Sequence, residues 1–261
     1  MDWNFIIFSL VKIAVVVGVV QGLVAYSVLA ERKISAWIQD RVGPNRCAPP
    51  FMKYVPGGTF LTRLGIFQPL ADGLKFMFKE DFTPAGVKKI YFFLAPAVSV
   101  IPAMLTVAVI PFGSVMGSQK MVIADLNVGI LYTFGIVSMG VYGIVLAGYA
   151  ANSKYPMFGG IRSSAQMISY EISMGMSVIP VLLIVGALNL NQIITWQATN
   201  GWLVIYAPIS FIIFMVASFA ETNRTPFDLP EAETELVGGY HTEYGSMKFA
   251  GITETAGARK K

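Results

Sequence analysis

Five glutamates in the second half of this chain are the residues whose type and spacing suit proton transfer. Glu171 lies inside an apolar run, Glu221 ends the next run, and Glu231, Glu233 and Glu235 follow in a short acidic stretch. A carboxylate inside or at the edge of a membrane is costly, so it usually has a function. Clustered carboxylates also repel one another and release their protons over a spread of pH. The pattern therefore predicts a path that passes protons or responds to a nearby charge.

Each of these carboxylates also has a simpler interpretation. Glu171 can be a structural residue that bonds to a neighbouring helix, Glu221 an ordinary interfacial carboxylate, and the acidic stretch a solvated loop. Four polar side chains near Glu171 favour the proton path, because they can hydrate the carboxylate or bond to it. They are Gln166, Ser169, Tyr170 and Ser173. The acidic stretch is interleaved with apolar residues, which favours docking against a partner.

A basic stretch near the N-terminus is the second group of chemically useful residues. It begins at Glu31 and contains a Gly43-Pro44 turn, a combination typical of a loop. Its cations can pair with the acidic stretch and fix the two loops together. They are Arg32, Lys33, Arg41 and Arg46.

Composition limits the chemistry that the chain can carry by itself. Of its 261 residues, 55% are hydrophobic and only 13% are charged, which indicates a membrane protein. Cys47 is the one cysteine and His241 the one histidine, so internal disulfides, Cys-ligated clusters and bis-His haem are excluded. Any redox cofactor is expected on a partner. Cys47 is expected to be structural, and His241 a solvated loop residue.

The hydropathy pattern predicts an all-α polytopic membrane bundle with five spans. A span needs about 20 apolar residues. The qualifying segments are residues 5–29, 91–112, 126–150, 165–190 and 202–220. Prolines inside the spans, such as Pro96 and Pro208, predict kinks that neighbouring helices stabilise.

Lysine and arginine alternate sharply between the loops and predict the orientation. The segments 30–90 and 151–164 and the tail from residue 221 carry 17 of the 19 lysines and arginines, so the positive-inside rule puts them on the inner side and the N-terminus outside. The net charge of +4 then reflects membrane orientation and not a nucleic-acid surface. We expect one membrane domain over residues 1–250, followed by a polar tail, 251–261. Glu171 would lie roughly 10 Å from the inner edge.

The first inner loop contains a regular apolar stripe. Phe67, Leu70, Leu74 and Met77 recur at helical spacing, whereas Asp72 and Lys75 fall on another face. This predicts an amphipathic helix that lies in the membrane interface.

Several long motifs give the chain a family resemblance. The stretches ERKISAWIQDRVGPNR (31–46), QPLADGLK (68–75), RSSAQMISYE (162–171), ETNRTPFDL (221–229) and EAETELV (231–237) resemble, in the same order, those of the H-type membrane subunits of NADH–quinone oxidoreductase, respiratory complex I. The resemblance covers most of the chain to about Ala250.

The resemblance implies a multi-pass membrane subunit of a proton-translocating NADH dehydrogenase in the respiratory electron-transport chain. It implies that Glu31, Arg32, Arg41 and Asp72 line or support a quinone tunnel. Glu171 and the four later glutamates would form the acidic path that couples quinone reduction to proton transport. Quinone, such as ubiquinone, is the implied substrate, with the iron–sulfur cluster on a partner.

The implied partners are hydrophilic iron–sulfur and quinone-site subunits, through which NADH acts, antiporter-like membrane subunits and the lipid bilayer, with no nucleic acid. The implied location is the cell inner membrane, or the mitochondrial inner membrane in an organelle.

The sequence departs from the family pattern after Ala250. Family members continue with further spans, whereas residues 251–261 are too polar to cross a bilayer. A C-terminal truncation, a divergent reading frame and a second polypeptide that supplies the rest are all open.

Three other functions remain as alternatives. The equivalent component of a membrane-bound hydrogenase-type complex is the nearest relative in the same superfamily. A stand-alone proton-coupled transporter would need an internal repeat with paired broken helices, and the two halves show none. A purely structural anchor for a soluble redox module would tolerate neutralisation of the inner-loop acids.

Overall fold

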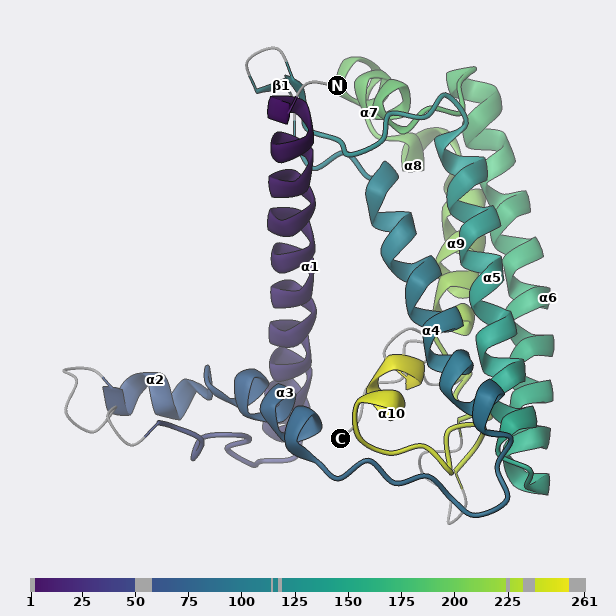
Figure 1. Cartoon of the computed structure of the whole chain (residues 1–261). Helices are drawn as coiled ribbons and strands as arrows, with labels where there is room; N and C mark the ends of the chain where they lie inside the picture. The colour runs from purple at the N-terminus through teal and green to yellow at the C-terminus, as the bar shows by residue number, and fades with distance from the viewer. Residues whose placement is uncertain are drawn as a thin grey trace. The chain divides into compact units, whose positions relative to one another are not determined.

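The computed structural model describes residues 3–49, 58–113, 115–116, 119–223, 226–231 and 238–253. It divides the chain into two compact units (Figure 1). The first unit is formed by residues up to Glu80, and the second begins at Asp81.

The first unit consists of one long helix and two short ones. Helix α1, Trp3–Ile38, has 36 residues and continues well past the predicted end of the first span, residue 29. Helix α2 is Gly58–Leu64, and α3, Gln68–Phe78, packs against α1. The predicted amphipathic helix is confirmed as α3, and three of its stripe residues are exposed within the unit: Leu70, Leu74 and Met77. Its place in a membrane interface stays a prediction.

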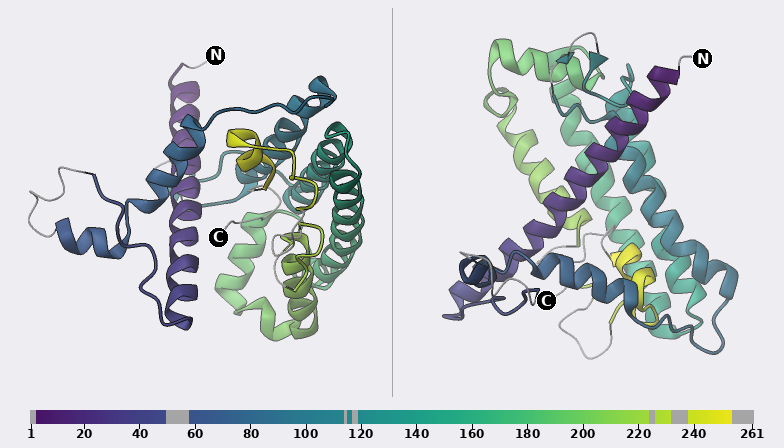
Figure 2. Two further views of the ribbon diagram at one scale, coloured as in Figure 1. Left: turned by 90° about the horizontal axis from the view of Figure 1, so that it is seen from below. Right: turned by 60° about the vertical axis from the view of Figure 1, so that its left-hand side comes forward.

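The second unit is a bundle of four main helices. They are α4 (Lys89–Thr106), α5 (Gly129–Ala150), α6 (Lys154–Val185) and α9 (Pro208–Glu221). Helix α5 lies between α4 and α6, and α6 also packs on α9 (Figures 1 and 2). The short helix α10, Ser246–Thr253, packs on α4.

Small residues allow α5 and α6 to approach closely. A Cβ atom on Gly148 would lie 2.6 Å from the Pro156 carbonyl oxygen and 3.4 Å from the Cα of Gly160. Close backbone approach at glycine is a common way for membrane helices to pack, because lipid supplies no hydrophobic force between them. Glycine at residue 148 therefore sets the distance between α5 and α6, the helix that carries Glu171.

The ends of the bundle differ in character. At one end lie the 3₁₀ turn Val107–Val109, helices α7 (Leu190–Asn200) and α8 (Leu203–Tyr206), and a small antiparallel hairpin, Val115–Met116 with Gln119–Lys120. At the other end the Lys88 amide donates to the Ala150 carbonyl, 3.0 Å. Helix α10, which packs on α4, lies toward this second end (Figure 1). Lys88 and Lys154 therefore share one end of the second unit, which the charge pattern predicts to be the inner one, whereas Glu221 lies within the bundle beside Met167 of α6.

The all-α class is confirmed, with one correction to the spans. Among the described residues, four helical segments are long and apolar enough to cross a membrane: Ile7–Ile38, Lys89–Val109, Gly129–Ala150 and Lys154–Val185. The predicted fifth span, residues 202–220, is broken between α8 and α9. Pro208 disfavours helical backbone at Ala207, which takes φ −136° and ψ 63°. Pro208 thus begins a helix of 14 residues instead of kinking a longer one.

The boundaries of the other spans also shift. Helix α6 begins at Lys154, so residues 154–164, predicted as part of an inner loop, are helical. Arg162 and its serine neighbours lower the hydropathy of this segment without breaking the helix, because they keep helical propensity. Helix α4 ends at Thr106 and α5 begins at Gly129, both inside the predicted spans.

Candidate functional site

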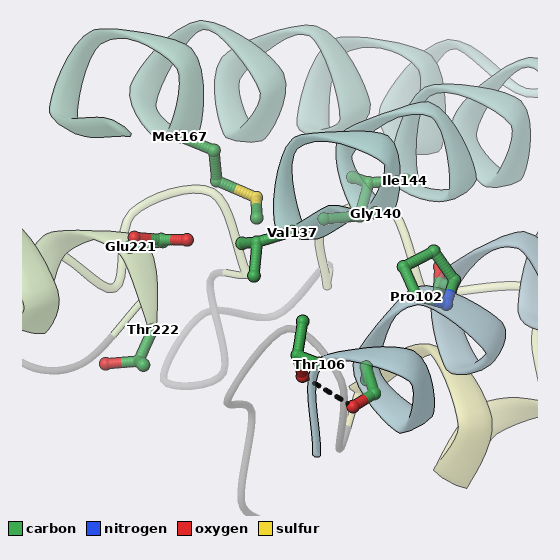
Figure 3. Close-up of a pocket in the computed structure, with 10 residues that line it drawn as sticks. Pro102, Thr106, Val137, Gly140, Ile144, Met167, Glu221 and Thr222 are labelled. Carbon is green, nitrogen blue, oxygen red and sulfur yellow. Dashed lines mark hydrogen bonds between the residues drawn. The ribbon is translucent and has the colours of Figure 1, made fainter. Parts of the chain in front are cut away.

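A cavity of about 200 Å³ lies between the four main helices of the second unit. Figure 3 shows Glu221 and Thr222 on one side of it and Pro102 and Thr106 on the other. The remaining lining residues are Ser99, Ala103, Val137, Gly140, Ile144 and Met167. This volume can hold several water molecules, and the hydroxyl and carboxylate groups can bond to them.

Glu221 is the ionisable residue in the cavity wall, and Glu171 lies nearby. Glu221 is half-buried at the last residue of α9. Glu171 follows Met167 by four residues on α6, so the two share a helix face, and Met167 lines the cavity. The carboxylates of Glu171 and Glu221 repel each other electrostatically. The structure therefore places Glu221 in the wall of a space that can hold water, with Glu171 one helical turn beyond the lining residue Met167.

The polar neighbours expected around Glu171 bond elsewhere. The Ser169 hydroxyl donates to the Ala165 carbonyl, 2.8 Å, and the Ser173 hydroxyl to the Ser169 carbonyl, 3.3 Å. Tyr170 packs edge-on against Phe227, with ring centroids 5.3 Å apart. Among the described residues, none forms a hydrogen bond or ion pair with the Glu171 carboxylate. The two serines thus do not hydrogen-bond directly to Glu171, because a helical hydroxyl readily bonds to its own helix.

Glu231 lies in a separate, buried environment. Its side chain is only 1% exposed. The Glu231 carboxylate accepts hydrogen bonds from Tyr240 Oη at 2.9 Å and from Asn223 Nδ2 at 3.1 Å. The Gly239 amide donates to the Glu231 carbonyl, 2.8 Å, so the loop folds back over this residue. Charge-assisted bonds of this kind can hold a buried carboxylate ionised.

Gln166 connects this loop to α6. Its Nε2, which carries two hydrogens, lies within hydrogen-bond distance of three acceptors, so one hydrogen is shared. The acceptors are the Ala220 carbonyl at 2.8 Å, the Phe227 carbonyl at 3.0 Å and Asn223 Oδ1 at 3.0 Å. Asn223 Nδ2 is also 3.5 Å from the buried hydroxyl of Ser163, one helical turn before Gln166. The end of α9 and the start of the acidic stretch are therefore bonded to one face of α6.

In the first unit the predicted residues Arg32 and Asp72 form an ion pair. The Arg32 guanidinium lies 2.6 Å from the Asp72 carboxylate, and Gln68 Nε2 donates to the other Asp72 oxygen at 3.0 Å. Both side chains are partly buried. Arg41 bonds to Gln39, and Glu31 is exposed within the unit. The pair joins α1 to α3, a contact that was not predicted from the sequence.

Four residues discussed in the sequence analysis remain: Glu233, Glu235, His241 and Cys47. Glu233 and Glu235 lie outside the described residues. His241, expected to be solvated, is buried against the rings of Tyr240 and Phe249. The cysteine, Cys47, is half-buried, with its sulfur 3.8 Å from the Phe67 carbonyl oxygen. In the part of the chain that the structure describes, no three His, Cys, Asp or Glu side chains are grouped to hold a metal ion.

Comparison with known proteins decides the family. A family model described as NADH dehydrogenase matches residues 11–257. The chain belongs to the NADH dehydrogenase family. Similar proteins include the NADH-quinone oxidoreductase H subunit numbered 1 of Geobacter metallireducens, which is 49% identical over 248 residues, 94% of this chain and 71% of the relative. The protein of the same name from Cytophaga hutchinsonii is 46% identical over 249 residues, 94% of this chain and 69% of the relative.

A third relative carries a different label. NADH-quinone oxidoreductase subunit 8 of Thermus thermophilus is 45% identical over 258 residues, 96% of this chain and 66% of the relative. The NADH dehydrogenase resemblance that the five motifs predicted is thereby confirmed.

For this NADH dehydrogenase chain, residue-level reasoning missed three contributors to the site. Asn223 and Tyr240 were not singled out, and Gln166 was assigned to Glu171. The signal for Asn223 is its position two residues after the last helical residue, where asparagine often adopts the left-handed conformation. Its φ of 47° agrees with that role. Tyr240 offers no comparable local signal, because its contact depends on how the loop folds.

Proposed function

We propose that this chain borders the quinone site of an NADH–quinone oxidoreductase and couples quinone reduction to proton translocation. The proposal is supported by the names of its relatives, which are subunits of NADH-quinone oxidoreductase. It places the chain in the cell inner membrane, or its mitochondrial counterpart, with the N-terminus outside. Hydrophilic iron–sulfur subunits and antiporter-like membrane subunits are its proposed partners.

One observation carries the proton-coupling part: Glu221 faces a cavity within a helix bundle, and Glu171 lies close enough to repel it. Two carboxylates beside a space large enough for water can exchange a proton through that water. Because each disfavours ionisation of the other, protonation of one favours charge on its neighbour. A change in charge at either end of the path would therefore be passed on.

The quinone-binding part is proposed for the first unit. Arg32, held by Asp72, presents a fixed guanidinium that can donate to a quinone oxygen or stabilise its reduced form. Glu31 and Arg41 are proposed as further residues of the same wall. Electrons would reach the quinone from an iron–sulfur cluster on a partner, and this chain would supply positioning and protons.

Glu231, Glu233 and Glu235 are proposed to continue the acidic path. Glu231 supports this role through its burial and its two hydrogen-bond donors, which allow it to hold a charge away from solvent. Asn223 bonds to both Glu231 and Gln166. A change in the charge of Glu231 would therefore alter the hydrogen bonds that connect Asn223 to Gln166 on α6.

The direct test is neutralisation of the cavity residue Glu221 and of Glu171 in the assembled enzyme, which gives two variants called the cavity variants. We expect Glu171→Gln and Glu221→Gln each to lower NADH:quinone turnover and proton pumping by about 100-fold, the lower end of the range for loss of a proton-transfer group. Turnover and pumping would be measured in membrane vesicles, with complex amount checked on native gels.

The matched control is Glu80→Gln, which removes an exposed carboxylate elsewhere on the chain. It should leave turnover and pumping unchanged. Normal turnover and pumping in both cavity variants would contradict the coupling role. Co-purification then separates the alternatives: a transporter would purify without iron–sulfur subunits, and a hydrogenase-type complex would evolve hydrogen.

A further inference from the structure

We propose that Gln166 and Asn223 are positioning residues that act as one hydrogen-bond relay between α6 and the buried Glu231. Neither touches the proposed proton-exchange cavity, yet each holds a carboxylate-bearing segment. The inference rests on the proposed coupling function and adds to it two neutral residues that set the geometry of the path.

The orientation of the Gln166 amide is fixed by its surroundings. Two of its three acceptors are the main-chain carbonyls of Ala220 and Phe227, which can only accept hydrogen bonds. The Nε2 group must therefore face them, because a flipped amide would set oxygen against oxygen. Gln166 cannot exchange donor for acceptor without losing both bonds.

That orientation dictates the orientation of Asn223. Its Oδ1 must face the Gln166 donor, so its Nδ2 turns toward Glu231 Oε1, 3.1 Å away, and toward the Ser163 hydroxyl. Asn223 is only 3% exposed, so water does not compete freely for these bonds. The result is a one-way chain of donors that runs from Gln166 through Asn223 to the Glu231 carboxylate.

The backbone conformation of Asn223 links the end of α9 to the relay. Asn223 follows α9 with φ 47°, and its amide donates to the Ala220 carbonyl, 3.3 Å. The same residue thus ends the helix that carries Glu221 and bonds to Glu231. If the donor to Glu231 is lost, charge on that carboxylate is less favoured, and the end of α9 loses its tie to α6.

A double-mutant cycle in the assembled enzyme tests the relay. Gln166→Met keeps the length of the side chain and removes its donors. Asn223→Gly keeps the left-handed backbone, which glycine adopts readily, and removes the side-chain bonds to Gln166, Glu231 and Ser163. We expect each single variant to lower maximal turnover and the number of protons pumped per NADH severalfold, with the KM for quinone within about twofold of wild type, since the relay acts on charge transfer and not on binding.

The double variant decides whether the two residues act as one unit. A relay predicts that Gln166→Met with Asn223→Gly is no worse than either single variant. Losses that multiply, a raised quinone KM with a normal pumping ratio, or an unaffected Gln166→Met enzyme would overturn the proposal. Gln192→Met, at an exposed residue of α7, is the matched control and should be silent.

The cavity variants separate this inference from the proposed function. If Glu171→Gln and Glu221→Gln impair pumping while the relay variants do not, the relay alone is refuted. If none of the four impairs pumping, the coupling function itself fails. A Gln166→Met chain that does not assemble shifts the test to Asn223→Gly, and normal pumping by that variant refutes the relay.

Discussion

At the residue scale, the carboxylates of this chain are held in two different ways. Glu221 faces a space that can hold water, whereas Glu231 is enclosed and bonded to Asn223 and Tyr240. A hydrated carboxylate exchanges protons readily, and an enclosed one keeps whichever charge its donors favour. The two residues are therefore suited to transfer and to charge storage respectively.

The Arg32–Asp72 ion pair supports a residue-scale prediction. We expect Asp72→Asn to raise the quinone KM severalfold, because Arg32 loses the partner that orients it. The free energy of unfolding should fall by about 1 kcal/mol or less, since both side chains are partly exposed. Quinone titrations and thermal unfolding of the purified enzyme check both expectations.

The control for that variant is Asp40→Asn, which removes an exposed acid at the end of α1, where asparagine tolerates the φ of 53°. A KM that rises equally in both variants would point to a general charge effect and contradict a specific role for the pair.

At the element scale, the site depends on how closely the helices pack. Glycine at residue 148 lets α5 contact α6, and α6 supplies Met167, Glu171 and Gln166 to the site. The break before Pro208 sets where α9 starts, and Asn223 sets where the chain turns after it ends. Helix ends therefore determine where Glu221 lies.

We expect Gly148→Val to destabilise the chain by about 2 kcal/mol or more, because its side chain would overlap the Pro156 carbonyl and overpack the contact. Thermal unfolding in detergent and complex yield would measure the loss. The control is Gly135→Val on the same helix, where a Cβ atom meets nothing within 4 Å. Equal loss in both variants would mean that helix propensity, not packing, is responsible.

At the scale of the whole molecule, the orientation in the membrane is the prediction with the widest consequences. In the second unit, Lys88 and Lys154 lie at one end, and α7 lies at the other (Figure 1). The positive-inside rule predicts that the end with Lys88 and Lys154 is the inner one. The same rule predicts that the loop after α1 lies on the inner side.

The single cysteine allows a test of that orientation. A membrane-impermeant maleimide should label Cys47 in inside-out vesicles and not in right-side-out spheroplasts. A chain with Cys47→Ser and Thr199→Cys, an exposed residue of α7, should show the reverse. Labelling of Cys47 from the outer side would contradict the predicted topology.

Much of this organisation could be predicted from the sequence, for identifiable reasons. Apolar runs, the stripe of α3 and the motifs around Glu171 and Glu221 are local patterns, so they identified helices, family and candidate carboxylates. The break at Ala207 was missed because hydropathy averages over a proline. The links from Gln166 to Asn223 and from Glu231 to Tyr240 depend on how the loop after α9 folds. No local sequence pattern therefore predicts them.

The length of α1 has a mechanical consequence. Its 36 residues form a rod of about 54 Å, whereas the hydrocarbon core of a bilayer is about 30 Å thick. A rod this long acts as a lever: one degree of tilt about its first residue moves its last residue sideways by about 1 Å. Arg32 lies near the C-terminal end of α1, the end that this tilt displaces. Bilayer thickness, which alters helix tilt, would thereby displace the guanidinium relative to the membrane surface.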